Sequence, residues 1–249
     1  MLIDVGTKSF EELNKEIRHT LETDNNIVLN DVNGQRYIGC AMDAGNSIII
    51  NGTPGNDLAA YLNGGFVEVV GNGQDAVGNT MNGGKIVIHG NAGDAAGYAM
   101  RAGEIYIKGN SGYRCGIHMK QYKDARPVIV IGGKAGSFLG EYMAGGIIVV
   151  LGLDAERGLN DASIPPMGSY CGTGIHGGVM YIRGDAPKNL LGREVVVEKC
   201  LDSDYDIIRT YVKNYCNYFA ADETSIMDHS FLKLRAVSGR PYGNMYTSN

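Results

Sequence analysis

Short segments in which apolar and polar residues alternate recur along the middle of the chain, and each one ends at a glycine. Ile86 and Ile88 alternate with Lys85 and His89 before Gly90, and the segment that ends at Gly109 has the same pattern. Alternation with a period of two is typical of a strand with one buried face. The pattern therefore predicts a series of short, half-buried strands.

The glycines that end these segments follow a period of 19 residues. Insertions of 5 and 13 residues interrupt it before the fifth and the seventh of these marker glycines, which are Gly52, Gly71, Gly90, Gly109, Gly133, Gly152 and Gly184. Counted from the markers, offsets +3 and +7 hold further repeat glycines: Gly55, Gly78, Gly93, Gly97, Gly112, Gly116, Gly136, Gly140, Gly168 and Gly172. Offsets +6 and +10 hold apolar residues, and the +10 column includes Met81, Met100 and Met119. A 19-residue unit cannot bury its own apolar face, so the units must stack.

Stacking of these units predicts an all-β fold, a right-handed parallel β-helix of about seven coils with N- and C-terminal helical caps. The right hand follows from the usual handedness of parallel connections. A left-handed hexapeptide solenoid would need a period of six, which the columns lack. Glycines at fixed corners allow positive φ or close packing in every coil.

Three regions are expected, residues 1–30 as an N-terminal helical cap, 31–200 as the β-helix and 201–249 as a C-terminal helix with an extended tail. In the first region, Ser9 and Glu12 form a capping-box pattern ahead of an amphipathic helix that would cover the first coil.

The chain closes with a second predicted helix from Asp204 to Phe219, after a last strand at residues 195–197, and a tail from Phe231 onward that has no clear period. We expect caps at both ends because open coil edges invite aggregation.

Composition excludes several classes of protein. Glycine makes up 37 of 249 residues, and the net charge is −5, without a basic block that would suit a nucleic-acid backbone. No apolar run approaches the roughly 18 residues of a membrane-spanning helix, and the first residues lack a signal-peptide core. We therefore expect a cytoplasmic protein with neither a nucleic-acid nor a membrane partner.

Residues suited to catalysis or metal binding are not gathered by the repeat. The five cysteines form no CxxC pair, and no two histidines share a column, so we predict no metal site. Asp75 and Asp94 fall at the same offset in neighbouring coils, where paired carboxylates suit acid–base work, but their polar column favours a hydrated turn. We predict no catalytic or cofactor-binding residue in this chain.

Basic residues cluster around the first insertion, residues 120–126. The candidate partner contacts are Arg114, His118, Lys120, Lys123 and Arg126. They suit an acidic ligand or partner surface, and the alternative is an exposed loop without a role. The second insertion, residues 153–164, is a further candidate contact.

The repeated Gly-x-x-Gly-x-x-x-Gly pattern, seen at Gly90–Gly97 and Gly109–Gly116, resembles the GXGXG domain of glutamate synthase. The resemblance covers about residues 34–192, and a related scaffold subunit of formylmethanofuran dehydrogenase has a similar pattern. It implies a structural element beside catalytic domains. In glutamate synthase an N-terminal cysteine amidotransferase and a barrel with FMN and an iron–sulfur cluster carry the chemistry, and neither is visible here, since position 2 is Leu.

The resemblance therefore implies the third domain of the large subunit as a separate polypeptide, a non-catalytic scaffold in a multi-subunit glutamate synthase. FMN and the iron–sulfur cluster are expected in a partner subunit, and the sequence leaves open whether this chain also forms a homo-oligomer. A first alternative is the corresponding scaffold of formylmethanofuran dehydrogenase. A second, from another class, is a free-standing β-helix enzyme acting on carbohydrate, which would need converging carboxylates on one face.

Overall fold

The computed structural model describes residues 1–153 and 165–238, and its strands form one 11-stranded sheet in the order β1-β2-β3-β4-β5-β6-β7-β8-β9-β11-β10. The strands are β1 (Leu2–Asp4), β2 (Asn26–Asn33), β3 (Ser47–Thr53), β4 (Asn63–Val70), β5 (Asn82–Ile88), β6 (Ala102–Ile107), β7 (Pro127–Ile131), β8 (Ala144–Val150), β9 (Gly177–Arg183), β10 (Val195–Lys199) and β11 (Phe231–Ala236). The helices are α1 (Phe10–Thr20), α2 (Asp202–Phe219), α3 (Glu223–Met227) and the short 3-10 helix η1 (Lys188–Leu190).

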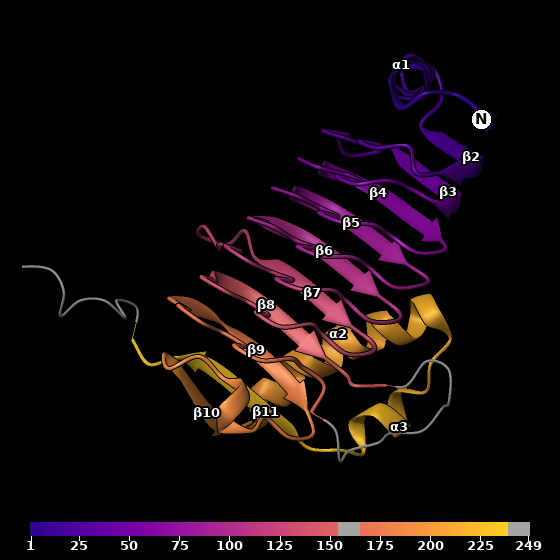
Figure 1. The fold of residues 1–249 in the computed structure, drawn as a ribbon. Coiled ribbons are helices and arrows are strands. Elements are labelled where there is room, and N and C mark those ends of the chain that lie inside the picture. The colour runs from indigo at the N-terminus through magenta and orange to yellow at the C-terminus, as the bar shows by residue number, and fades with distance from the viewer. Residues whose placement is uncertain (154–164, 239–249) are drawn as a thin grey trace, which may run out of the picture.

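Strands β1 to β9 pair in parallel, each with the next along the chain, and form a β-solenoid (Figure 1). Ile48, Val67, Ile86, Ile105 and Ile129 lie in register on successive strands, and all are fully buried. The prediction of a parallel β-helix from the 19-residue period is confirmed.

The apolar columns at offsets +6 and +10 fill the interior of the solenoid. Met81, Met100 and Met119 are fully buried in the main core cluster, as are Cys115 and Leu139 at offset +6. The stack of buried methionines on which the predicted register depends is therefore present.

The solenoid has about six turns, one fewer than the seven expected from the marker glycines. The reason lies after Gly184, where the last unit does not continue into another parallel strand. Strand β11 takes that place, antiparallel to β9 on one side and to β10 on the other. Residues 231–236 of the expected extended tail are thus a strand, while residues 239–249 lie outside the described part.

Helix α1 closes the first end of the solenoid. Ser9 Oγ accepts a hydrogen bond from the backbone N–H of Glu12, and Glu12 Oε2 accepts one from the N–H of Ser9, so the predicted capping box is present. Leu13 and Ile17 are buried in the same core cluster as the first strands. The predicted N-terminal cap is therefore confirmed.

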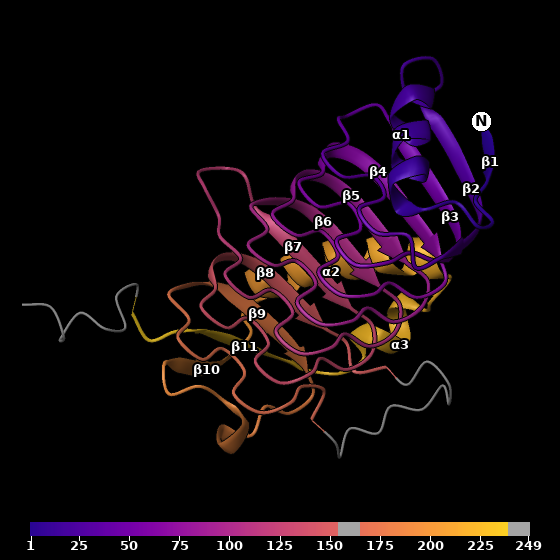
Figure 2. The same cartoon turned by 45° about the horizontal axis from the view of Figure 1, so that its top comes forward.

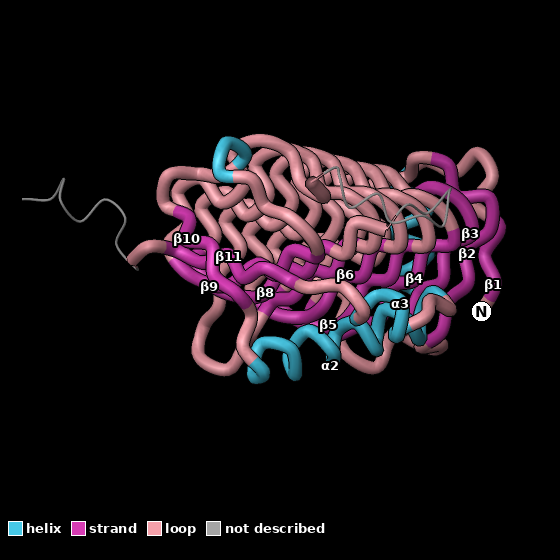
Figure 3. Tube along the Cα trace, turned by 90° about the horizontal axis from the view of Figure 1, so that it is seen from below, coloured by secondary structure: helices cyan, strands magenta, loops and turns pink. Residues whose placement is uncertain are grey.

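Helix α2 has a different position from the expected C-terminal cap. It lies along the outer face of the strands, below the sheet in Figure 3, and does not cover the open end. Its buried residues Ile208, Val212, Tyr215 and Phe219 belong to a second core cluster with outward side chains of the sheet, including Tyr106. Strands β5 to β9 carry apolar residues on their outer face as well. Helix α2 therefore buries its apolar side against this face and not against the open end.

Polar side chains also form ladders along the solenoid. Asn72, Asn91 and Asn110 each accept, through Oδ1, a hydrogen bond from a backbone N–H one coil further on, at 2.7–2.8 Å. Asp75 and Asp94 do the same at the next corner, both at 2.8 Å. These side chains satisfy backbone donors where the coil turns and no strand ladder is available.

Candidate functional site

The wall opposite the strands is built from stacked turns with an unusual backbone (Figure 2). Residues at offsets +5, +7 and +9 adopt positive φ in coil after coil, for example Arg114 at 57°, Gly116 at 71° and His118 at 56°. At offset +7 the conformation and the packing favour glycine, since a Cβ on Gly97 would lie 2.4 Å from Ile129 Cδ1, although Ala59 occupies this offset in the first coil at φ 54°. At +5 and +9 the side chains point outward, away from the apolar columns.

Aromatic side chains occupy several of these strained outward positions and stack from coil to coil. The rings of His118 and Tyr142 are parallel, with centroids 5.3 Å apart and an angle of 11°. Tyr98 meets His118 edge to face at 6.0 Å, and Phe138 stacks on Tyr170 at 4.9 Å. A non-glycine residue at positive φ costs roughly 1–2 kcal/mol, so the sequence maintains aromatic rings where glycine would fold more easily.

Arg114 packs against the Phe138–Tyr170 stack. Its guanidinium carbon lies 4.9 Å from the centroid of the Phe138 ring, and its Nε donates a hydrogen bond to Glu141 Oε2 at 3.1 Å. The Arg114 side chain remains about half exposed, while that of Glu141 is largely covered. We call Tyr98, Arg114, His118, Phe138, Tyr142 and Tyr170 the aromatic–basic surface. Such exposed Tyr and Arg side chains are enriched at protein–protein contacts.

The structure does not gather all of the basic residues that the sequence grouped around the first insertion. Arg114 and His118 lie within the aromatic–basic surface, and Lys120 follows directly as an exposed residue. Lys123 Nζ lies over the ring of Tyr122 at 5.3 Å. Arg126 directly precedes β7, on the strand side, and its charge opposes the rise that burial causes in the pKa of Tyr211 on α2. The second insertion lies almost wholly outside the described residues.

Several side chains that could act as nucleophiles or in acid–base chemistry have structural roles instead. Burial raises the pKa of both Cys115 and Cys171 to about 12, so neither thiol is a reactive nucleophile. Asp75 and Asp94 use carboxylate oxygens to hold the backbone of the next coil. His89 is half-buried, with Nε2 2.7 Å from Glu68 Oε1 and its ring edge to face with Phe219.

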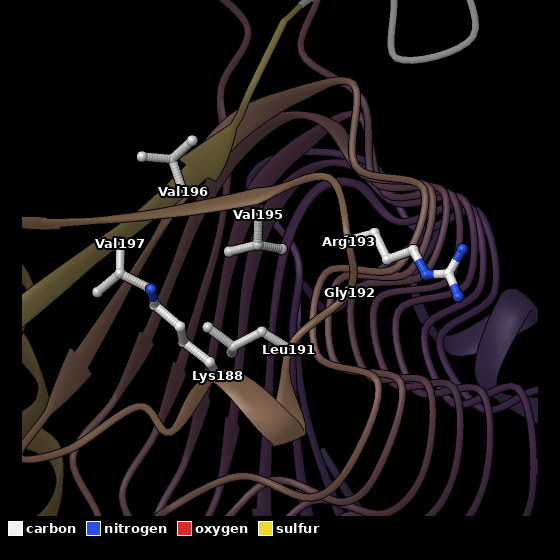
Figure 4. Close-up of a pocket in the computed structure, with 7 residues that line it drawn as sticks. All are labelled: Lys188, Leu191, Gly192, Arg193, Val195, Val196 and Val197. Carbon is white, nitrogen blue, oxygen red and sulfur yellow. The ribbon is translucent and has the colours of Figure 1, made fainter.

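A cavity of about 480 Å³ opens at the C-terminal end of the solenoid, where β10 follows η1. Figure 4 shows Leu191, Val195 and Val197 around it, with Lys188 and Arg193 at its rim. No carboxylate, thiol or imidazole is among its lining residues. The described part of the chain also contains no group of three His, Cys, Asp or Glu side chains arranged to hold a metal ion.

Comparison with known families identifies this solenoid. The GXGXG motif profile matches residues 8–236, which is most of the chain. The chain belongs to the GXGXG family. An uncharacterized protein of Methanocaldococcus jannaschii is 46% identical over 254 residues, covering 99% of this chain and 96% of that protein.

A solved structure shares the GXGXG-family fold over nearly its whole length. It is the formyltransferase/hydrolase complex (FhcABCD) from Methylorubrum extorquens, crystallised with methylofuran, and one of its chains matches with a TM-score of 0.63 and 22% identity. The match covers 93% of this chain and 89% of that chain. No helix in the described part of our chain has both the length and the hydropathy needed to cross a membrane.

Sequence reasoning located the repeat of this GXGXG-family chain but missed its aromatic–basic surface. The +9 column was visible as Tyr61, Thr80, Ala99, His118 and Tyr142. The signal that could have revealed the surface is the recurrence of aromatic residues at the same offset in neighbouring coils. Stacked coils place such rings about 5 Å from each other.

Proposed function

We propose that this chain is a non-catalytic scaffold subunit of a multi-subunit enzyme complex. The observation that carries the proposal is the aromatic–basic surface, in which the rings of His118, Phe138, Tyr142 and Tyr170 stack in pairs on residues held at positive φ. Strained residues persist where the surrounding structure and a function both maintain them. Of the candidate reactive groups, Cys115 and Cys171 are buried in the core, and Asp75 and Asp94 are used by the polar ladders.

A complex of the formyltransferase/hydrolase type is the first candidate assembly. The support is the fold shared with a chain of the FhcABCD complex over 93% of our chain. A match that extends over both chains to this degree is what a subunit of similar architecture and length would give. In such a complex the chain would hold formyl-transferring subunits together. This corresponds to the first alternative from the sequence, a scaffold of formylmethanofuran dehydrogenase.

Glutamate synthase is the second candidate assembly, supported by the GXGXG motif itself. Here the chain would pack against a synthase subunit and an amidotransferase subunit. FMN and the iron–sulfur cluster would be bound by the synthase subunit, with no cofactor in this chain. Lys120, Lys123 and Arg126 remain proposed contacts in either assembly, together with Arg114 and His118.

Purification of the tagged full-length chain from its native host tests both forms. We expect partner subunits to co-elute in fixed stoichiometry and the chain alone to show no flavin absorbance and no turnover. Glutamine-dependent glutamate formation with FMN and iron–sulfur absorbance would select glutamate synthase, whereas formyl transfer would select the other complex. Recovery of the chain alone, or only as a homo-oligomer, at native expression levels would contradict the scaffold role.

A further inference from the structure

Strand β10 leaves one edge of the sheet unpaired at the C-terminal tip of the solenoid (Figure 1). It is the last strand in the order of the sheet, and in the described part of the chain only β11 pairs with it. Its sequence has three valines in a row and no proline, and its pairing with β11 has no bulge. Edge strands usually avoid further pairing through a proline, a bulge or a very short length, and β1 at the other tip has only three residues. The β10 edge is therefore open to one more strand.

The register identifies the backbone groups that lie on this edge. The N–H of Val237 donates to the carbonyl oxygen of Glu194, just before β10, and the antiparallel pairing continues from there without a shift. Since alternate residues of an antiparallel strand bond to the same neighbour, every second residue from Glu194 onward faces β11. The N–H and C=O of Val197 and the C=O of Val195 therefore point to the unpaired edge. Backbone groups in this arrangement can bind an added strand.

The cavity of about 480 Å³ lies along the same strand and reaches the end of the core. Leu191, Val195 and Val197 line it, and all three are partly buried side chains that pack against the main core cluster (Figure 4). Helix α1 closes the other end of the solenoid, whereas α2 packs on the outer face of the sheet. An added strand has side chains on alternate faces, so every second one could enter the cavity and bury these apolar residues.

The rim of the cavity favours an acidic occupant. Lys188 and Arg193 lie there, both are exposed, and no carboxylate is among the lining residues. The carboxylates nearest in the sequence accept hydrogen bonds elsewhere, and these are Asp185, Glu194 and Glu198. An Asp or Glu side chain of the occupant would therefore meet two cations at the rim.

Two occupants from this chain itself fit less well. If β10 of a second copy paired across the edge in the register that places valine opposite valine, Arg193 would lie opposite Lys199. Like charges directly opposite each other destabilise a sheet. Residues 239–249 contain a proline, two glycines and an arginine but no Asp or Glu. Their composition provides neither the strand propensity nor the charge that this edge favours.

We propose that the unpaired edge of β10 binds an extended segment of a partner subunit as one more strand of the sheet. The segment carries apolar side chains at alternate positions, facing the cavity, and Asp or Glu beside Lys188 and Arg193. Backbone hydrogen bonds along β10 supply affinity, and the cavity with its basic rim selects the sequence. This inference rests on the proposed scaffold function and names one surface and one kind of partner element. It is separate from the aromatic–basic surface, which lies on the turn wall.

Photo-crosslinking within the native complex tests the proposal. The full-length chain is expressed in its host with p-benzoylphenylalanine in place of Lys199, the exposed last residue of β10, and the crosslinked residues are mapped by mass spectrometry. We expect crosslinks to one segment of one partner subunit, in which apolar residues alternate and Asp or Glu is present. The matched control places the same probe at Leu2, which is exposed on the edge strand β1 at the other tip, and should not crosslink to that segment.

Several outcomes would overturn the proposal. They are crosslinks from position 199 to a second copy of this chain, to residues 239–249 or to a partner segment without alternating apolar residues, and the absence of any crosslink in an intact complex. These results would leave the scaffold function standing, whereas failure to recover any complex with the unmodified chain would remove both.

Removal of one backbone donor provides a second, independent measurement. Val197→Pro deletes the N–H that faces the unpaired edge, and an edge strand tolerates proline at such a position because no hydrogen bond to β11 is lost. Partner binding should fall at least tenfold, whereas Val197→Ala, which keeps the N–H, should stay within about threefold of the original chain. Equal binding by Val197→Pro and Val197→Ala would overturn the proposal.

Charge reversal at the rim gives a further readout if Val197→Pro proves unstable. Arg193→Glu should weaken partner binding about tenfold, and the loss should shrink at high salt because the contact is ionic. Lys213→Glu is the matched control, since Lys213 is exposed on α2, away from the cavity, and should leave binding within about twofold. Equal binding by Arg193→Glu and Lys213→Glu would contradict an acidic partner segment at this edge.

Discussion

The ring of Tyr142 lies against the backbone of Gly174 in the next coil, where a Cβ would come within 2.5 Å of ring atoms. On its other side the same ring stacks on His118 of the preceding coil. Tyr142 is therefore held between two coils and still keeps 38% of its surface exposed. A ring that is both fixed and exposed loses little conformational entropy when a partner covers it.

The aromatic–basic surface is expected to contribute to partner binding without being needed for folding. The double variant His118→Ala/Tyr142→Ala should weaken association with the co-purified subunits about tenfold or more, because Tyr side chains dominate many interfaces. Binding by surface plasmon resonance and thermal melting measure the two effects separately. Tyr61→Ala is the matched control, since Tyr61 is exposed at the same offset with φ 58°. Equal loss in both variants would argue against a specific contact.

A side chain at Gly97 is expected to destabilise the solenoid. Its φ is 70°, and a Cβ would lie 2.4 Å from Ile129 Cδ1 in the core. Gly97→Ala should lower the free energy of unfolding by about 2 kcal/mol or more, through backbone strain and overpacking. Ala99→Gly, two residues on and also at positive φ, should change it by less than about 1 kcal/mol. Urea unfolding of both variants makes the comparison, and similar midpoints would contradict it.

The cysteines are expected to fall into two classes of reactivity. Burial raises the pKa of Cys115 and Cys171 from 9.0 to about 12, so almost no thiolate forms at pH 8. Burial also raises the pKa of Cys40, and it raises those of Cys200 and Cys216 to about 11, but these three thiols are partly exposed. Iodoacetamide should therefore modify them slowly in the native protein and leave the two buried thiols intact. All five should react in urea. Mass spectrometry of the alkylated peptides checks this, and native labelling of Cys115 would mean that the coil opens.

Attachment of the C-terminal segment is expected to depend on pH through Asp204. Burial acts to raise its pKa, but hydrogen bonds from Lys233, from the Leu201 N–H and from Tyr181 outweigh it and leave the pKa below 3.8. A carboxyl with a lowered folded pKa stabilises the fold above its unfolded pKa and loses that contribution as the pH falls through the folded value.

Asp204→Asn should therefore lower the free energy of unfolding by about 1–3 kcal/mol at pH 7, and the difference should shrink below pH 4. Urea titrations at pH 7, 5 and 3 measure it. Asp206→Asn, at an exposed position of the same helix, should stay within about 0.5 kcal/mol of the original at each pH. A difference that persists unchanged at pH 3 would contradict the role of the charge.

The interior of the solenoid was predictable because the same positions must be apolar or glycine in every coil. Gly97 and Met100 belong to columns that the 19-residue period displays directly, so local pattern and global fold agree at these positions. Insertions did not disturb the columns, since extra residues can leave at a corner without moving the strands on either side.

The position of α2 was not predictable from its own pattern. Its apolar residues indicate an amphipathic helix but do not say which apolar surface they cover. The signal lay elsewhere, in outward residues such as Val87 and Tyr106, where a strand facing water would carry polar side chains. The aromatic–basic surface was missed for a related reason, because the stacking of His118 on Tyr142 depends on the positive φ of both residues.

The reversal of direction at β11 has a consequence for molecules that meet end to end. Strand β1 at one tip runs parallel to its neighbour, whereas β10 at the other tip is the outer member of an antiparallel pair. A second molecule that meets this tip would have to pair with β10, whose direction does not continue the parallel repeat. The parallel repeat therefore does not continue from the β10 edge of one chain into β1 of the next.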